Sequence, residues 1–69
     1  MLVFKIDVLA ELKEAGYNTT RLRREKIFGE STIGRFRRGE MVESRVIDKL
    51  CELLDLQPGN IIRYVPDQK

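Results

Sequence analysis

The sequence predicts a mainly all-α fold of five short helices, with a small two-stranded sheet that pairs the N- and C-terminal segments. Glycine and proline cut the 69 residues into short pieces at Gly16, Gly29, Gly39 and Pro58–Gly59. Between these breaks, apolar residues recur with the three-to-four spacing of amphipathic helices, and both ends of the chain favour extended structure. At this length we expect one domain over residues 1–69.

The first two helices are expected on either side of Gly16, which suits a left-handed C-terminal cap. Asp7 is a good N-cap for the first helix. One face of that helix is apolar and carries Val8, Leu9, Leu12 and Ala15. The second helix is expected to start at Asn18–Thr20 and to run to about Lys26, and the apolar pair that follows falls in the connection.

A third helix is predicted from Glu30 to about Arg38, with Gly39 ending it. Ile33 and Phe36 are three residues apart and can share a buried face. The residues left facing outward are Glu30, Ser31, Gly34, Arg35 and Arg38.

The fourth helix follows the loop from Glu40 to Glu43 and has the clearest pattern. Its apolar stripe consists of Ile47, Leu50, Cys51 and Leu54. Cys51 is most simply a small core residue. Pro58 suits the first position of a last short helix, which Asn60, Ile61 and Ile62 would complete.

The two terminal segments are rich in β-branched and aromatic residues, which favour strands. They are Leu2, Val3, Phe4 and Ile6 at the front, and Ile62, Tyr64 and Val65 at the back. We expect them to pair as a sheet that leans on the helices, because an isolated pair of strands is marginal in water. Tyr64 is expected to pack rather than to bind a ligand.

The composition excludes several classes of site. With one cysteine and no histidine, the chain can form neither an internal disulfide nor a closed zinc site, so we expect no metal, no cofactor and a reducing, cytoplasmic location. The apolar run of residues 1–4 is too short for a signal peptide or a membrane span. Carboxylates are scattered and no nucleophile has a basic partner, so we expect neither an enzyme nor a small-molecule ligand.

The positive charge is concentrated in one segment. Between Thr20 and Gly39 the chain has seven basic and two acidic residues, a net charge of +5, although the whole chain carries only +2. The rest therefore carries −3. Such a block indicates either one surface that faces a polyanion or a solvated helix face, and charge alone does not choose between them. Arg21, Arg24 and Lys26 in particular can be solvent-facing charges.

Two short helices joined by a tight turn, the second with exposed polar side chains, form a helix-turn-helix. The segment "STIGRFRRG", Ser31 to Gly39, resembles the recognition helix and closing glycine of the Cro/repressor-type (XRE-like) helix-turn-helix family, which has the lambda-repressor-like fold. The segments "IDVLAELKEAGYNTTRL", "VIDKLCELLDLQPGNII" and "RYVP" are similar to one branch of small regulators in that family. The resemblance covers nearly the whole chain.

The resemblance implies which residues contact double-stranded DNA. Base contacts are expected from Glu30, Ser31 and Arg35, with Thr32 nearby, because one α-helix fits the major groove and arginine pairs well with guanine. Phosphate contacts are expected at the start of the second helix and at the end of the third. The full expected set is Thr19, Thr20, Gly29, Glu30, Ser31, Thr32, Arg35, Arg37 and Arg38.

The chain also departs from the family pattern. Arg23 stands where the second helix usually has a small residue, and Ile27 stands where the turn usually has a glycine. Gly29 falls at the N-cap of the recognition helix, where serine or threonine would be stronger. The loop after Gly39 is acidic rather than basic, which argues against phosphate contacts from this loop.

The leading hypothesis is a sequence-specific transcriptional regulator, a repressor that occupies operator DNA as a homodimer. The candidate dimer surface is the terminal sheet with the last helix. The alternative is a helix-turn-helix module that binds protein or RNA, since a fold does not dictate its function.

Overall fold

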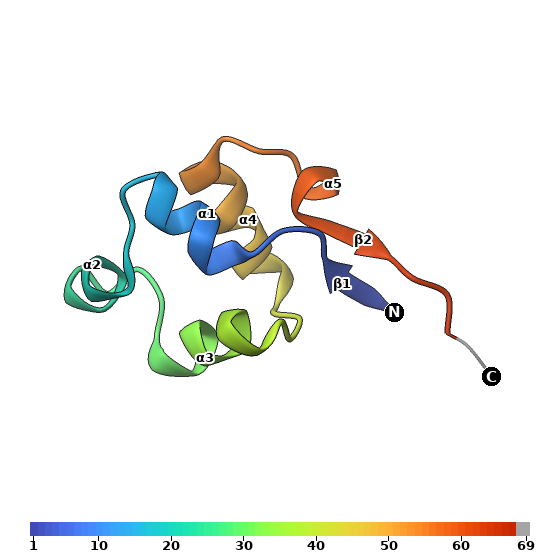
Figure 1. Ribbon diagram of the computed structural model, residues 1–69, viewed down its shortest axis with the longest axis horizontal. Helices are drawn as coiled ribbons and strands as arrows, with labels where there is room; N and C mark the ends of the chain where they lie inside the picture. The colour runs from blue at the N-terminus through green and yellow to red at the C-terminus, as the bar shows by residue number, and fades with distance from the viewer. Residues whose placement is uncertain (68–69) are drawn as a thin grey trace.

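The computed structural model describes residues 1–67, which form five helices and one two-stranded sheet (Figure 1). The elements in order are β1 (Leu2–Phe4), α1 (Val8–Glu14), α2 (Thr19–Arg24), α3 (Glu30–Arg38), α4 (Ser44–Leu54), α5 (Pro58–Ile61) and β2 (Ile62–Tyr64). In Figure 1, α1 and α4 lie at the centre, α2 and the sheet lie at opposite ends, and α3 lies below. The mainly helical prediction with a terminal sheet is confirmed.

The start signals of the first two helices act as predicted. The Asp7 carboxylate accepts a hydrogen bond from the Ala10 amide at 3.3 Å, and the Asn18 side chain accepts one from the Arg21 amide at 2.8 Å. Each side chain satisfies a backbone donor that the first turn of a helix leaves unpaired. Gly16, with a φ of 95°, reverses the chain after α1 as expected.

The prediction that the second helix runs to about Lys26 was wrong by two residues. The helix ends at Arg24, and Lys26 takes a left-handed conformation with a φ of 54°. The reversal of the turn therefore falls on Lys26, one residue before Ile27, where the family resemblance placed it. No glycine marks this position in the sequence, so the end of the helix was hard to predict.

The third helix has the predicted bounds, from Glu30 to Arg38. Gly29 is its N-cap and makes no side-chain hydrogen bond, and Gly39 closes it in a left-handed conformation with a φ of 73°. Ile33 and Phe36 are buried, as expected from their spacing. One side of α3 is thus fixed to the domain.

The fourth and fifth helices differ from the prediction at one residue. Ile62 was expected both to complete the last helix and to belong to the C-terminal strand. The structure confirms the strand, because α5 ends at Ile61 and Ile62 begins β2 with extended backbone angles. Pairing with Phe4 across the sheet explains this outcome, because tertiary contacts override a weak local preference at the end of a four-residue helix. Cys51 is half-buried and packs against the core.

The two strands are antiparallel, and their partners are Leu2 with Tyr64, Val3 with Arg63, and Phe4 with Ile62. Ile6 was expected in the first strand but lies beyond its end. Val65 follows β2 and extends the pairing, since its amide donates to the Met1 carbonyl at 2.8 Å. The Tyr64 side chain does not pack inward, contrary to expectation, and is 67% exposed.

One apolar core joins the helices, because the buried face of each points to the same centre. It consists of Val8, Leu12, Leu22, Phe28, Ile33, Phe36, Ile47, Leu50 and Ile61. All five helices, including the short α5, and the turn before α3 contribute to this core. Among residues 1–67, no helix has the length and apolar character needed to cross a membrane.

Candidate nucleic-acid interface

The outer side of α3 is a polar surface that the domain leaves open. Ser31, Arg35 and Arg38 are exposed, and they lie opposite the buried Ile33 and Phe36 on the helix. This arrangement follows from the helical period, which places residues four apart on one side. The structure therefore brings these three predicted site residues together on a single face, which we call the α3 outer face.

The inner side of α3 is held by aromatic contacts. The Phe36 ring meets the Phe28 ring edge-on with centroids 5.1 Å apart, and it meets the Phe4 ring with centroids 6.1 Å apart. Edge-to-face packing of this kind stabilises a pair of rings beyond the area that it buries. These contacts fix α3 to both the preceding turn and β1, so the outer face is presented on a rigid element.

The N-terminal end of α3 carries Gly29, Glu30 and Thr32. The Glu30 side chain is 71% exposed, and its carboxylate accepts a hydrogen bond from Nε of Arg23 on α2. Arg23, the bulky residue in the middle of α2, thus directs its charged group to the next helix. This ion pair crosses the turn and gives Glu30 a partner that the sequence did not reveal.

The C-terminal end of α3 carries a second ion-pair cluster around Glu40. Nε of Arg38 donates to the Glu40 carboxylate at 2.6 Å, and Nη1 of Arg35 lies 3.7 Å from the same carboxylate. The hydrogen bond from Arg38 is the main cause that lowers the pKa of Glu40, and the same bond raises the pKa of Arg38. Each group thus stabilises the charged form of the other.

Three further predicted residues lie together on a different side. Thr19 and Thr20, at the start of α2, line a hollow that also includes Arg37 from α3, Lys13 from α1 and the acidic Asp7. Hydroxyl groups and cationic side chains are the usual protein partners of phosphate oxygens. The nine predicted residues thus divide into two groups: those at the two ends and on the outer face of α3, and those that line this separate hollow.

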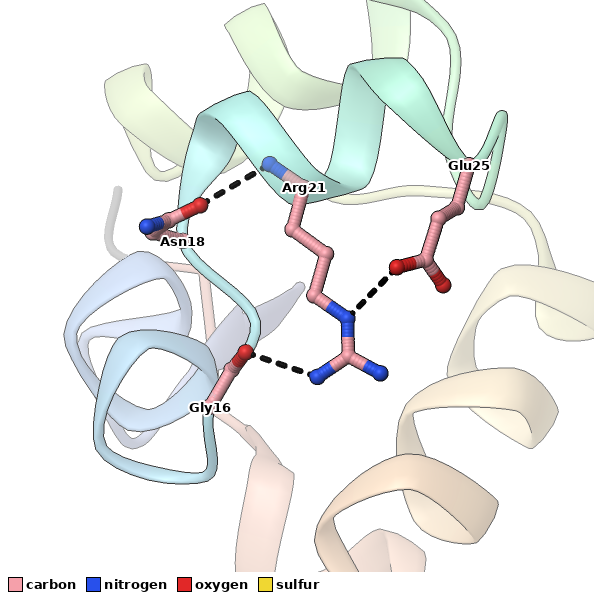
Figure 2. A network of polar contacts seen from close by, with 4 residues as sticks. All are labelled: Gly16, Asn18, Arg21 and Glu25. Atoms are coloured by element: carbon pink, nitrogen blue, oxygen red, sulfur yellow. Dashed lines mark hydrogen bonds and ion pairs between the residues drawn. The ribbon is translucent and has the colours of Figure 1, made fainter.

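Arg21 was one of the basic residues whose role the sequence left open, and its charge is used inside the domain (Figure 2). Its Nη1 donates to the Gly16 carbonyl at 2.9 Å, and its Nε donates to the Glu25 carboxylate at 2.8 Å. Its guanidinium also lies over the Tyr17 ring, 4.5 Å from the centroid. Arg21 therefore ties α2 to the end of α1.

The helix pair α2–α3, the buried inner face and the open basic outer face can be compared with known families. A family model for the Cro/C1-type HTH DNA-binding domain matches residues 5–67. The chain belongs to this family. A search of curated proteins and a search of solved structures each found no match.

Membership makes this chain a Cro/C1-type DNA-binding domain, and the match extends from Lys5, just after β1, through β2. The sequence analysis did not predict the ion pairs of Glu40 and Arg23 with residues of α3. A signal for the first was available in "RRGE", residues 37–40, because a glycine that ends a helix turns the next side chain back over the last turn. For Arg23 and Glu30, seven residues apart across a turn, no such local signal exists.

Proposed function

We propose that this Cro/C1-type domain is a sequence-specific transcriptional regulator of the cytoplasm, which represses by occupying operator DNA. The observation that carries the proposal is the α3 outer face, where polar Ser31 and Arg35 are exposed on a helix whose other side is locked into the core. A single helix with three or four such side chains is what the major groove admits. Occupancy involves no chemical step, so the proposal requires no enzymatic activity.

The proposed roles follow the position of each residue. Arg35 would pair with a guanine edge, while Ser31, Thr32 and Glu30 would lie beside neighbouring bases. Gly29, which has no side chain, would let the DNA approach the start of α3. The phosphate backbone would be contacted by Thr19, Thr20, Arg37 and Arg38, which set register without carrying sequence information.

The sequence preference is the part of this proposal that one experiment decides. Selection from a random duplex library with the purified domain should enrich one short site. Affinity for that site should exceed affinity for random duplex by about 10³-fold or more. If the selected pool shows no common site, the operator-reading proposal is wrong, and binding of protein or RNA becomes the better hypothesis for this fold.

We further propose that two copies bind together, which would set two half-sites about 34 Å apart. Support comes from the terminal sheet, where Leu2 and its partner Tyr64 are 48% and 67% exposed. Beside them lies a hollow of about 370 Å³ with mainly apolar walls from β1, α4 and β2. Exposed apolar surface of this kind is typical of interaction sites.

The dimer proposal is tested by the mass of the protein in solution and on DNA. A dimer through the sheet should dissociate at low concentration, and Tyr64→Asp should weaken it. A selected site with inverted symmetry would agree with a two-fold dimer. A monomer mass at every concentration, with and without DNA, would contradict it.

A further inference from the structure

Glu40 lies just beyond the end of α3, with its carboxylate between two arginine side chains of that helix. The carboxylate accepts hydrogen bonds from Arg38, at 2.6 Å from Nε and 3.5 Å from Nη2, and it lies 3.7 Å from Nη1 of Arg35. The backbone also fixes Glu40, since its amide donates to the Arg35 carbonyl at 2.8 Å after the left-handed turn at Gly39. The position of Glu40 therefore depends on more than a mobile ion pair.

The guanidinium of Arg38 lies back along the helix near Gly34, although its side chain is 59% exposed. A Cβ atom built on Gly34, one turn earlier, would lie 3.2 Å from Nη1 of Arg38. The missing side chain at Gly34 thus leaves room for the guanidinium, and Glu40 holds it there. Because the two nitrogens toward Glu40 are occupied, an external anion meets this arginine already paired.

The Glu40 carboxylate binds arginine in the same way as a DNA phosphate would. A carboxylate and a phosphate both present two oxygens to the fork of an arginine, so they compete for the same donors. The Glu40 carboxylate is negative at neutral pH, and its pairing with Arg38 lowers its pKa below the ordinary value. The Glu40 side chain is 47% exposed, so solvent and an approaching anion can reach the ion pair.

We propose that Glu40 is an internal competitor of the DNA phosphates, which weakens the sequence-independent attraction of the α3 outer face for any duplex. Arg38 and Arg35 must be released by Glu40, or shared with it, before they contact DNA. This inference rests on the proposed function, because it takes α3 as the face that meets DNA. It explains why an acidic residue stands beside the most basic part of the chain.

The test is Glu40→Gln, which keeps the size of the side chain and removes its charge. We expect affinity for random-sequence duplex at about 0.1 M salt to rise about 3- to 5-fold, the size of an exposed ion pair. The plot of log affinity against log salt should steepen by about 0.9, as for one more neutralised phosphate. Unchanged or weaker binding to random duplex would overturn the proposal.

Glu43→Gln is the matched control, because it makes the same charge change three residues further along the same loop. The Glu43 carboxylate pairs with Arg45 at the start of α4, at 2.9 Å, instead of with a side chain of α3. We expect less than half of the gain in log affinity from this variant. Equal gains would mean that net charge alone matters, and the proposal would be wrong.

A double-mutant cycle tests whether Glu40 acts through its arginine partner. In an Arg38→Gln background, Glu40→Gln should give a smaller gain than in the wild type, since the competed donor is gone. The same gain in both backgrounds would contradict the proposal. Glu40→Ser serves as a second variant without the charge, and it must show the same direction of change if either variant loses stability.

The binding of the wild-type protein to DNA tests the proposed function independently of this inference. Equal affinity for a selected site and for random duplex would refute sequence-specific reading. The Glu40 proposal is refuted separately, by random-duplex affinity that does not rise in Glu40→Gln while Arg38→Ala still weakens binding.

Discussion

The ring of Phe36 stands at 88° to the ring of Phe28, so α3 is held by an edge-to-face contact with the turn that precedes it. Phe36→Leu keeps an apolar side chain but loses this contact and the similar one with Phe4. We expect the free energy of unfolding, measured by urea denaturation, to fall by about 1–3 kcal/mol.

The exposed ring of Tyr64 offers a control for the Phe36 experiment. Tyr64→Leu should change the free energy of unfolding by less than about 0.5 kcal/mol at low protein concentration, as is usual for surface positions. If Phe36→Leu had no larger effect than this, the aromatic contacts would not be what holds α3.

Lys26 adopts a backbone conformation that favours glycine. Its φ of 54° in the turn between α2 and α3 is costly for a residue that carries a Cβ atom. We expect Lys26→Gly to raise the free energy of unfolding by about 0.5–1 kcal/mol. In contrast, Glu52→Gly, inside α4, should lower it by about 1 kcal/mol. A loss of stability in Lys26→Gly, measured by thermal unfolding, would contradict the strain.

Gly34 is inside a helix, where glycine is unfavourable. The nearest atom to an added Cβ is the flexible end of Arg38 at 3.2 Å, which can move away. We expect Gly34→Ala to raise the free energy of unfolding by up to about 1 kcal/mol. Gly16→Ala should lower the same quantity, because Gly16 has a φ of 95°. Chemical denaturation of both variants checks this, and a fall for Gly34→Ala would show that the Arg38 guanidinium cannot be displaced.

The two arginines of the α3 outer face should affect binding in different ways. Arg35→Ala should lose about 1–3 kcal/mol of discrimination at one or two base positions. Arg38→Ala should weaken binding to all sequences and flatten the salt dependence, as expected of a phosphate contact. Arg63→Ala, on β2, removes the same charge as a control. Titration of each variant against the selected site and its point variants measures these effects, and identical behaviour of the two α3 variants would refute the division.

The architecture was predictable where local signals agreed with one another. Gly29 and Gly39 flank α3, and Ile33 and Phe36 mark its buried side, so its bounds and its outer face followed from the sequence. Asp7 and Asn18 likewise marked the starts of α1 and α2. In these cases the cap, the period and the glycine all point to the same residue.

The structural features that the sequence did not predict depend on contacts between segments. The sequence placed Ile62 both in the last helix and in the C-terminal strand, and its pairing with Phe4, almost sixty residues away along the chain, decides for the strand. The end of α2 was missed because Lys26, with no glycine signal, adopts a left-handed conformation. The pairing of Arg23 with Glu30 depends on the path of the turn between them. The conformation of the turn and this ion pair depend on the assembled fold, so composition and spacing could not predict them.

The ladder between the two strands joins residues that are far apart in the chain, since the Val65 amide bonds to the Met1 carbonyl and the Lys5 amide to the Ile61 carbonyl. Closing so large a loop costs more entropy than forming any of the helices, whose contacts are local. The pairing of β1 with β2 should therefore form late during folding and open first during unfolding. Hydrogen exchange should be faster at Val3, in β1, than at Leu50, in α4, so that the ends of the domain can separate while the helical part persists.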